Sequence, residues 1–129
     1  MRVAEFIVPK ASGDSEDADV IIYYFAGGGG SVEANLQRWT SQFQSTKEPV
    51  RTTATVNGLK LTSLDVSGTY VAEMRPGSTE HYNKPGYRMR ATVVETPKGP
   101  YFIKLTGPAK TVDSAGAAFD QFLRSLAFK

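Results

Sequence analysis

The sequence of 129 residues predicts an α+β fold in which an antiparallel β-sheet of about six strands packs between helices as an α/β/α sandwich. Two hairpin signals, Asn57-Gly58 and Pro97-Lys98-Gly99, separate strand-like runs, so the strands on either side of each signal are expected to pair antiparallel. Two other stretches carry apolar residues at helical spacing, one before the first hairpin and one at the C-terminal end. The length suits one domain and no linker interrupts it, so residues 1–129 are expected to form a single domain.

The N-terminal part of the chain predicts two strands. Residues 3–8 alternate in the manner of a strand and stop at Pro9, which cannot donate a hydrogen bond to a neighbouring strand. A polar loop follows over residues 10–19. Residues 20–25 (VIIYYF) are apolar on both faces, which is typical of a central strand covered on both sides.

Helical spacing predicts the two helices. The first is expected over residues 31–45, with Ser31 as its N-cap and Glu33 favourably placed in its first turn. The second is expected over residues 111–127. The apolar residues that define them are Val32, Leu36, Trp39 and Phe43 in the first, and Val112, Phe119, Phe122, Leu123 and Leu126 in the second. Trp39 is expected to anchor the core.

The first hairpin, within residues 49–71, has a defined register. Asn57-Gly58 favours a two-residue type I′ turn, because both central positions of that turn need a positive φ. This turn pairs Val56 with Leu59 and Ala54 with Leu61. Beyond Leu61 the apolar residues change parity, which predicts a β-bulge near Thr62-Ser63.

The second hairpin joins residues 87–95 and 101–106. Pro97-Lys98-Gly99 suits a three-residue loop, with a type I turn followed by a left-handed glycine. A loop of that length pairs Val93 with Ile103 and Ala91 with Leu105. In the first of these strands Arg88 and Arg90 are expected to lie on a solvated edge face.

Composition excludes several classes of function. A formal charge of +2 gives no electrostatic argument for a nucleic-acid partner, and no apolar run is long enough for insertion into a membrane. The absence of cysteine excludes thiolate nucleophiles and cysteine-based metal sites. The N-terminus lacks the apolar run of a signal peptide, so the chain as written is not a precursor, although a mature exported protein is compatible with it.

The glycine run at residues 27–30 lies between a predicted strand and a predicted helix, the context of a phosphate-binding loop. No lysine follows in the next turn, as a P-loop requires, and Glu33 occupies the place of the third glycine of a dinucleotide fingerprint. A flexible hinge is the favoured interpretation. The alternative is an anion bound at the glycine loop, residues 27–31, by the backbone amides around Gly28, Gly29, Gly30 and Ser31.

The long loop at residues 74–86 is the other candidate site. Long loops often carry binding residues, and this one holds Arg75, His81 and Tyr82, which we expect to contact a ligand or partner. An enzyme site formed by His81, Glu80 and Arg75 is the alternative. No catalytic motif is present, so no catalytic residue is predicted.

The acidic residues of the 10–19 loop carry charge suited to calcium, but their spacing does not follow an EF-hand. They are Asp14, Glu16, Asp17 and Asp19. A solvated loop is therefore the favoured interpretation. No metal site and no cofactor are predicted.

Two segments, SVEANLQRW and FIKLTGPAKTV, carry a resemblance that extends over nearly the whole chain. The chain resembles a family of uncharacterised bacterial proteins whose members often carry a leader, so the resemblance implies a periplasmic or lipid-anchored envelope protein; a cytoplasmic location is the alternative. The order of the elements also resembles the PsbP-like α/β/α sandwich, whose known members work by binding. No catalytic residues are carried over from either resemblance.

These observations lead to one functional hypothesis and its alternatives. The sequence favours a non-catalytic binding or accessory domain of the bacterial envelope with an unknown protein or small-molecule partner. The alternatives are a small-ligand or enzyme site at the 74–86 loop and anion binding at residues 27–31. An enzyme site requires a concave pocket around His81, whereas a binding domain can present the loop on a flat surface.

Overall fold

The computed structural model describes residues 2–25, 30–45 and 47–128. Within them the chain forms an antiparallel sheet of seven strands and three short helices, which confirms the α+β class. The strands are β1 (Arg2–Val8), β2 (Ala18–Tyr24), β3 (Phe43–Gln44), β4 (Val50–Val56), β5 (Leu59–Tyr70), β6 (Lys84–Thr96) and β7 (Gly99–Pro108). The helices are α1 (Val32–Ser41), α2 (Ala109–Ser114) and α3 (Gly116–Arg124). The strand order is β1-β2-β7-β6-β5-β3, and β4 also pairs with β5.

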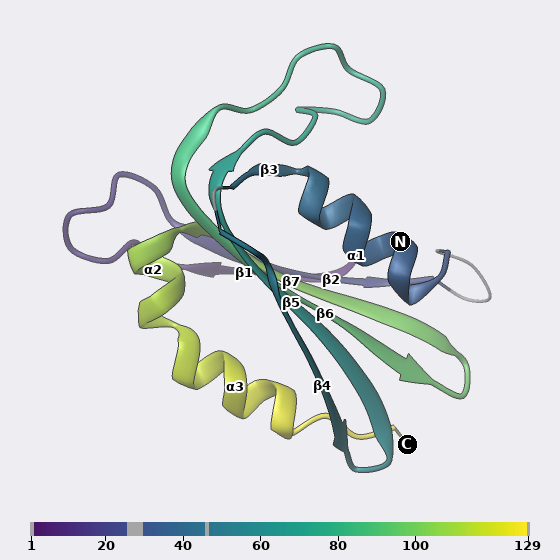
Figure 1. Ribbon diagram of the computed structural model, residues 1–129. Helices are drawn as coiled ribbons and strands as arrows, with labels where there is room; N and C mark the ends of the chain where they lie inside the picture. The colour runs from purple at the N-terminus through teal and green to yellow at the C-terminus, as the bar shows by residue number, and fades with distance from the viewer. Residues whose placement is uncertain (1, 26–29, 46, 129) are drawn as a thin grey trace.

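The helices lie on opposite faces of the sheet, with α1 on one side and α2 and α3 on the other (Figure 1). Successive residues of a strand point to opposite faces, so Val93 of β6 packs in the core under α1, while Val94 packs in the core under α3. The helices are few and short, so the complete α/β/α sandwich and its PsbP-like character stay predictions.

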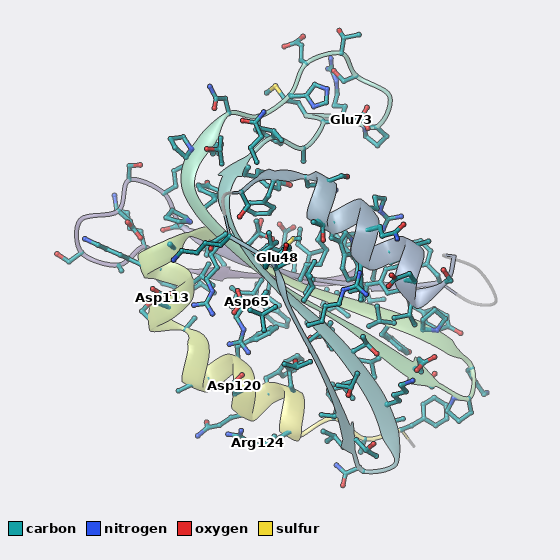
Figure 2. All side chains as sticks on the ribbon, in the orientation of Figure 1. Glu48, Asp65, Glu73, Asp113, Asp120 and Arg124 are labelled. Carbon is teal, nitrogen blue, oxygen red and sulfur yellow. The ribbon has the colours of Figure 1, made fainter. Side chains whose placement is uncertain are left out.

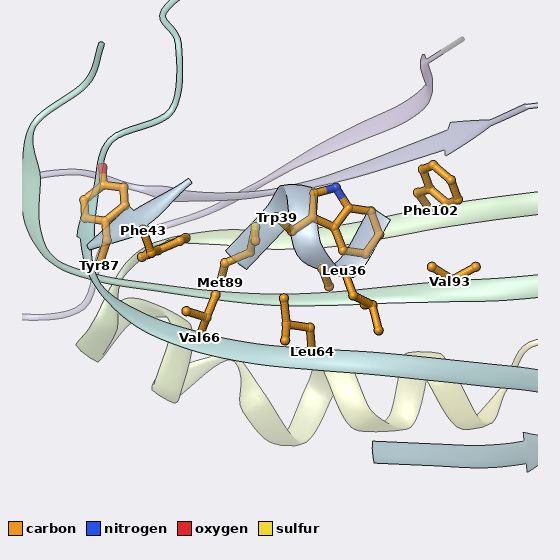
Figure 3. Close-up of a cluster of buried hydrophobic side chains, with 10 residues drawn as sticks. Leu36, Trp39, Phe43, Leu64, Val66, Tyr87, Met89, Val93 and Phe102 are labelled. Atoms are coloured by element: carbon orange, nitrogen blue, oxygen red, sulfur yellow. The ribbon is translucent and has the colours of Figure 1, made fainter. Parts of the chain in front are cut away.

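The core under α1 is built around Trp39, which is 1% exposed. The predicted role of Trp39 as a core anchor is therefore confirmed. Its ring meets Phe102 of β7 edge to face, with 5.4 Å between the ring centroids. Figure 3 shows Leu36 and Trp39 of α1 among side chains of the strands; those strand side chains are Leu64, Val66, Met89, Val93 and Phe102.

The first hairpin confirms the predicted register, with Val56 opposite Leu59 and Ala54 opposite Leu61. The predicted bulge near Thr62-Ser63 is wrong, because β4 and β5 pair without interruption through these residues. The apolar residues change parity for another reason: β5 contributes side chains to the core under α1 and to the core under α3. Its first part, Leu59 and Leu61, faces the α3 side, and its later residues Leu64 and Val66 face the α1 side.

A register shift does occur in β5, but it lies between Gly68 and Tyr70. Gly68 has a φ of +144°, and a Cβ there would lie 2.3 Å from the carbonyl oxygen of Gln44 in β3. Only glycine allows β3 to approach so closely at this point. The bend brings Tyr70 and the loop that follows it to the end of α1.

The predicted register of the second hairpin is wrong by one residue. Thr96 pairs with Gly99, so the loop is Pro97-Lys98, and Val93 pairs with Phe102 and Ala91 with Lys104. Both faces of β6 and β7 are covered by helices, and apolar side chains therefore point both ways. Hydrophobic parity alone could not choose between the two registers.

Both predicted helices differ from those observed. The predicted helix 31–45 ends at Ser41, and the two residues Phe43–Gln44 pair with β5 instead. The predicted helix 111–127 is two helices that meet at Ala115. The predicted loop 74–86 is shorter than expected, because β6 begins at Lys84.

The sequence suggested that Arg88 and Arg90 lie on a solvated edge face, and this prediction is wrong. β6 is an inner strand, and α2 and α3 cover this face (Figure 2). Arg88 binds Asp65 of β5 through two nitrogens and also binds Asp113 of α2. Arg90 binds Asp120 of α3 at 2.5 Å.

Candidate functional site

A cleft of about 1020 Å³ opens on the α1 side of the sheet, beside the last turn of α1. β2 and β7 supply its floor, and one wall is formed by Arg38 and Ser41 of α1 with Gln42 directly after the helix. Residues of the loop after β5 also line the cleft, and Figure 1 shows this loop beyond β3, near the end of α1. This loop carries Glu73, which Figure 2 labels. The cleft is therefore assembled from segments that are far apart in the sequence.

The floor of the cleft carries an acid and a base side by side. Asp19 of β2 pairs with Thr106 of β7, and Lys104 lies two residues before Thr106, so Asp19 and Lys104 are diagonal neighbours on one face. Such neighbours have Cα atoms about 7–8 Å apart. No ion pair joins them among the described residues, and each charge therefore lacks a close partner.

Lys104 is a partly buried amine with an aromatic neighbour. Its Nζ lies 5.6 Å from the centre of the Trp39 ring. Burial lowers the pKa of Lys104 to about 8, and the positive charge of Arg38 acts in the same direction, while Asp19 acts against it. Within the described residues no carboxylate forms an ion pair with Lys104 or Arg38. Two positive charges therefore lie close together here, and neither is in ion-pair contact with a described carboxylate.

Asp19 is a partly buried carboxylate. Burial raises its pKa, and the nearby Glu5 adds to the effect, while Arg2 and Lys104 oppose it. Two of the surrounding basic groups are already engaged: Arg2 binds Glu5 at 3.2 Å and Lys84 binds Glu16 at 2.6 Å. Neither approaches Asp19 closely enough to form an ion pair.

Three tyrosines form a stacked wall beside the floor. The Tyr70 ring lies between Tyr82 and Tyr87, with centroid distances of 5.6 Å and 5.8 Å. Lys84 Nζ lies over two of the rings, 5.2 Å from Tyr82 and 5.6 Å from Tyr87. Burial raises the pKa of Tyr70 to about 12, so its hydroxyl stays protonated at neutral pH. The wall thus offers aromatic faces that already hold one cation.

Glu16 fixes one end of this wall. It accepts hydrogen bonds from Lys84 and from the Tyr87 hydroxyl at 2.6 Å and 2.7 Å. These bonds lower the pKa of Glu16, the Lys84 bond having the larger effect. The 10–19 loop is thereby tied to the start of β6, and the rim of the cleft is braced on that side.

The predicted residues Arg75, His81 and Tyr82 all line the cleft, on its loop side. His81 Nδ1 donates to the carbonyl of Val71 at 2.8 Å, and a backbone bridge joins His81 to Glu73. Glu80, the third member of the alternative enzyme site, is not among the lining residues; its carbonyl accepts from the Met74 amide. The structure therefore brings together the predicted ligand contacts but separates Glu80 from them.

Of the glycine loop the structure describes Gly30 and Ser31, which lie at the other end of α1 from the cleft. Gly28 and Gly29 fall outside the described residues. Gly30 has a φ of +80°, and Ser31 caps the helix by accepting from the Ala34 amide at 3.0 Å. Anion binding here stays a prediction, and the nearby Glu33, paired with Arg51, adds negative charge to the helix start.

The acidic residues of the 10–19 loop have separate structural roles. Asp14 binds the amide and hydroxyl of Thr111 at the start of α2, and Asp17 accepts from the Lys10 amide. Across the part of the chain that the structure describes, no three His, Asp or Glu side chains cluster in a way that could hold a metal ion. In the same part, no helix is long and apolar enough to cross a membrane.

Sequence reasoning missed the floor and the helix wall of the cleft, namely Asp19, Lys104, Arg38 and Gln42. One signal was available, since Lys104 interrupts the apolar run YFIKLT on a strand expected to be buried. A charged residue inside such a strand needs a partner or a function. Arg38 and Gln42 gave no comparable signal, because both lie in a polar stretch of a surface helix.

Comparison with known proteins supports the fold alone. No protein-family profile matches the chain, and no curated protein matches it either. The chain is similar to the crystal structure of PA94 from Pseudomonas aeruginosa, a protein of unknown function described as a candidate regulator, with a TM-score of 0.66 and 21% identity. The match covers 98% of this chain and 82% of PA94.

Proposed function

We propose that this protein is a non-catalytic binding domain and that the cleft beside α1 is its ligand site. The observation that carries the proposal is the pair of partly buried, oppositely charged side chains on the floor, Asp19 and Lys104, neither with an ion-pair partner among the described residues. Charged groups removed from water are costly unless paired. A ligand that supplies the missing partners would offset this cost.

The shape of the cleft favours a small molecule over a flat protein partner. A volume of about 1020 Å³ is at the upper end of typical ligand sites, and aromatic rings form part of the wall. The contacts of His81 favour binding over catalysis. Its Nδ1 is engaged by a backbone carbonyl, and no described hydroxyl or carboxylate forms a hydrogen bond with the ring.

The biological setting of the proposed domain rests on the resemblances. An accessory role in the bacterial envelope is supported by the family resemblance of the sequence, and a PsbP-like sandwich by the order of the elements. The description of PA94 as a candidate regulator is compatible with a ligand-sensing role for this chain as well. Fractionation of the native cells would locate the protein, and recovery only from the cytoplasm would contradict the envelope role.

A thermal-shift screen tests the proposed function. The purified protein is screened against metals, nucleotides, phosphosugars and common metabolites, because a ligand that binds only the native state raises its melting temperature. At least one compound is expected to give a saturable shift that Lys104→Met removes. Lys98→Met, in the exposed turn between β6 and β7, serves as the matched control. No shift from any compound, or a shift unaffected by Lys104→Met, would contradict a ligand site in this cleft.

A further inference from the structure

We infer that the ligand of the cleft is zwitterionic, of the amino-acid or short-peptide class, with its carboxylate toward Lys104 and Arg38 and its ammonium toward Asp19. The inference rests on the proposed function and specifies its ligand. It is based on the placement of Asp19, Lys104 and Arg38 around one cleft, and on the ion pairs that neighbouring charged residues already form with one another.

The first end of the cleft is built to accept an anion. Lys104 rises from the floor and Arg38 lies in the wall beside it, close enough for the two charges to repel each other. In the described structure neither forms an ion pair. A carboxylate placed between them would relieve the repulsion and meet both groups, the guanidinium through two nitrogens.

The second end is built to accept a cation. Asp19 lies on the floor near Glu5, whose negative charge adds to the effect of burial in raising the pKa of Asp19. The basic groups nearby are engaged elsewhere, Arg2 with Glu5 and Lys84 with Glu16.

The separation of the two ends selects a molecule that carries both charges. Asp19 and Lys104 are diagonal neighbours on paired strands, and their Cα atoms are expected about 7–8 Å apart. An inorganic anion or an alkylamine could satisfy only one end, whereas an ammonium and a carboxylate joined through one or a few residues can meet both.

The size of the cleft bears on the length of the ligand. A volume of about 1020 Å³ is large enough for two or three residues.

The test compares zwitterions with their blocked forms on the intact chain. The probes are the common L-amino acids and a set of di- and tripeptides, each at neutral pH. Every probe that raises the melting temperature is retested as its N-acetyl form, which lacks the cation, and as its amide, which lacks the anion. Binding is then measured by calorimetry on the wild type, Lys104→Met, Asp19→Asn and the distant control Glu95→Gln.

The expected result is a saturable shift for at least one zwitterion and at least a tenfold loss of affinity on blocking either end. In Asp19→Asn the N-acetyl form should bind as well as the free zwitterion. In Lys104→Met the amide should bind as well as the free zwitterion. Glu95→Gln should leave all affinities unchanged. A misfolded variant would lose affinity for the blocked and unblocked forms alike, so misfolding could not produce this match between each variant and one blocked end. Bound ligand should also protect Lys104 from acetylation at pH 8, as read by mass spectrometry.

Two results would overturn the inference, and they differ in what they mean for the proposed function. If no zwitterion binds, but a metabolite of another class gives a shift that Lys104→Met removes, the cleft is a binding site for a different chemistry. If blocked and unblocked forms bind equally, the charged ends do not select the ligand. Absence of binding by every compound in both screens would defeat the proposed function too.

Discussion

Lys104 carries a charge that the folded state holds in a poorly solvated place, so its replacement by methionine should stabilise the protein. Burial lowers its pKa from the ordinary 10.5 to about 8. Below pH 8 the folded state bears a charged, desolvated amine, and between about pH 8 and 10.5 the unfolded chain binds more protons than the folded one. The contribution of Lys104 to stability therefore rises with pH across that window.

Lys104→Met should accordingly raise the free energy of unfolding by about 1–3 kcal/mol at pH 7, and the advantage should shrink as the pH approaches 10.5. Urea unfolding of both proteins at several pH values measures the difference. A variant less stable than the wild type at pH 7 would show that the amine is well accommodated. Stabilisation by removing a binding residue is a common trade-off.

At the scale of residues, sequence reasoning reached the side chains whose position needs only local information. Trp39 follows from helical spacing, and Arg75, His81 and Tyr82 follow from a long polar loop. Asp19 and Lys104 come together only because β2 pairs with β7, and no local pattern encodes that pairing. The contacts that define the floor were therefore beyond reach.

At the scale of elements, α2 depends on a cap from a distant loop. Its own N-cap, Pro108, makes no side-chain hydrogen bond, and Asp14 instead binds the amide and hydroxyl of Thr111. Asp14→Ala should cost about 0.5–2 kcal/mol of stability, the usual range for a lost cap. Denaturant unfolding measures it, with Ser12→Ala in the same loop as the control. Equal stability of the two variants would argue against the cap.

The two hairpins show why some registers could be predicted and others could not. Asn57-Gly58 fixed the first hairpin, because the turn and the neighbouring apolar residues allow a single pairing. In the second, Pro97-Lys98-Gly99 suits two loop lengths, and apolar side chains on both faces support either. The helix after β7 divides at Ala115, next to Gly116, although the apolar spacing continues across the break.

At the scale of the whole molecule, one sheet joins two cores, so we expect them to unfold together. Leu36 lies in the core under α1 and Leu123 in the core under α3. Leu36→Ala and Leu123→Ala should each cost about 2–5 kcal/mol and lower the midpoint of one shared transition. Scanning calorimetry checks this, because a single shared transition gives a calorimetric enthalpy equal to the van't Hoff enthalpy. Two separate transitions would contradict the predicted single domain over residues 1–129.

The general architecture was predictable because it follows from patterns repeated along the chain, whereas the cleft was not. Alternation and helical spacing recur in every element and require no knowledge of distant pairing. The cleft is formed where β2, β7, α1 and the loop after β5 meet, and each contributes only a few side chains. The register shift between Gly68 and Tyr70 directly precedes that loop, and the Val71 amide of the loop donates to the carbonyl of Gln42 at the end of α1.

The position of Trp39 gives the protein an optical reporter of its own cleft. It is the sole tryptophan of the chain, and the Lys104 ammonium lies over its indole ring. A charge at that distance perturbs the excited state of the ring, so loss of the proton from Lys104, or neutralisation of its charge by a bound carboxylate, should change the emission spectrum. Ligand binding and the titration of Lys104 can thus be followed by intrinsic fluorescence, without any label.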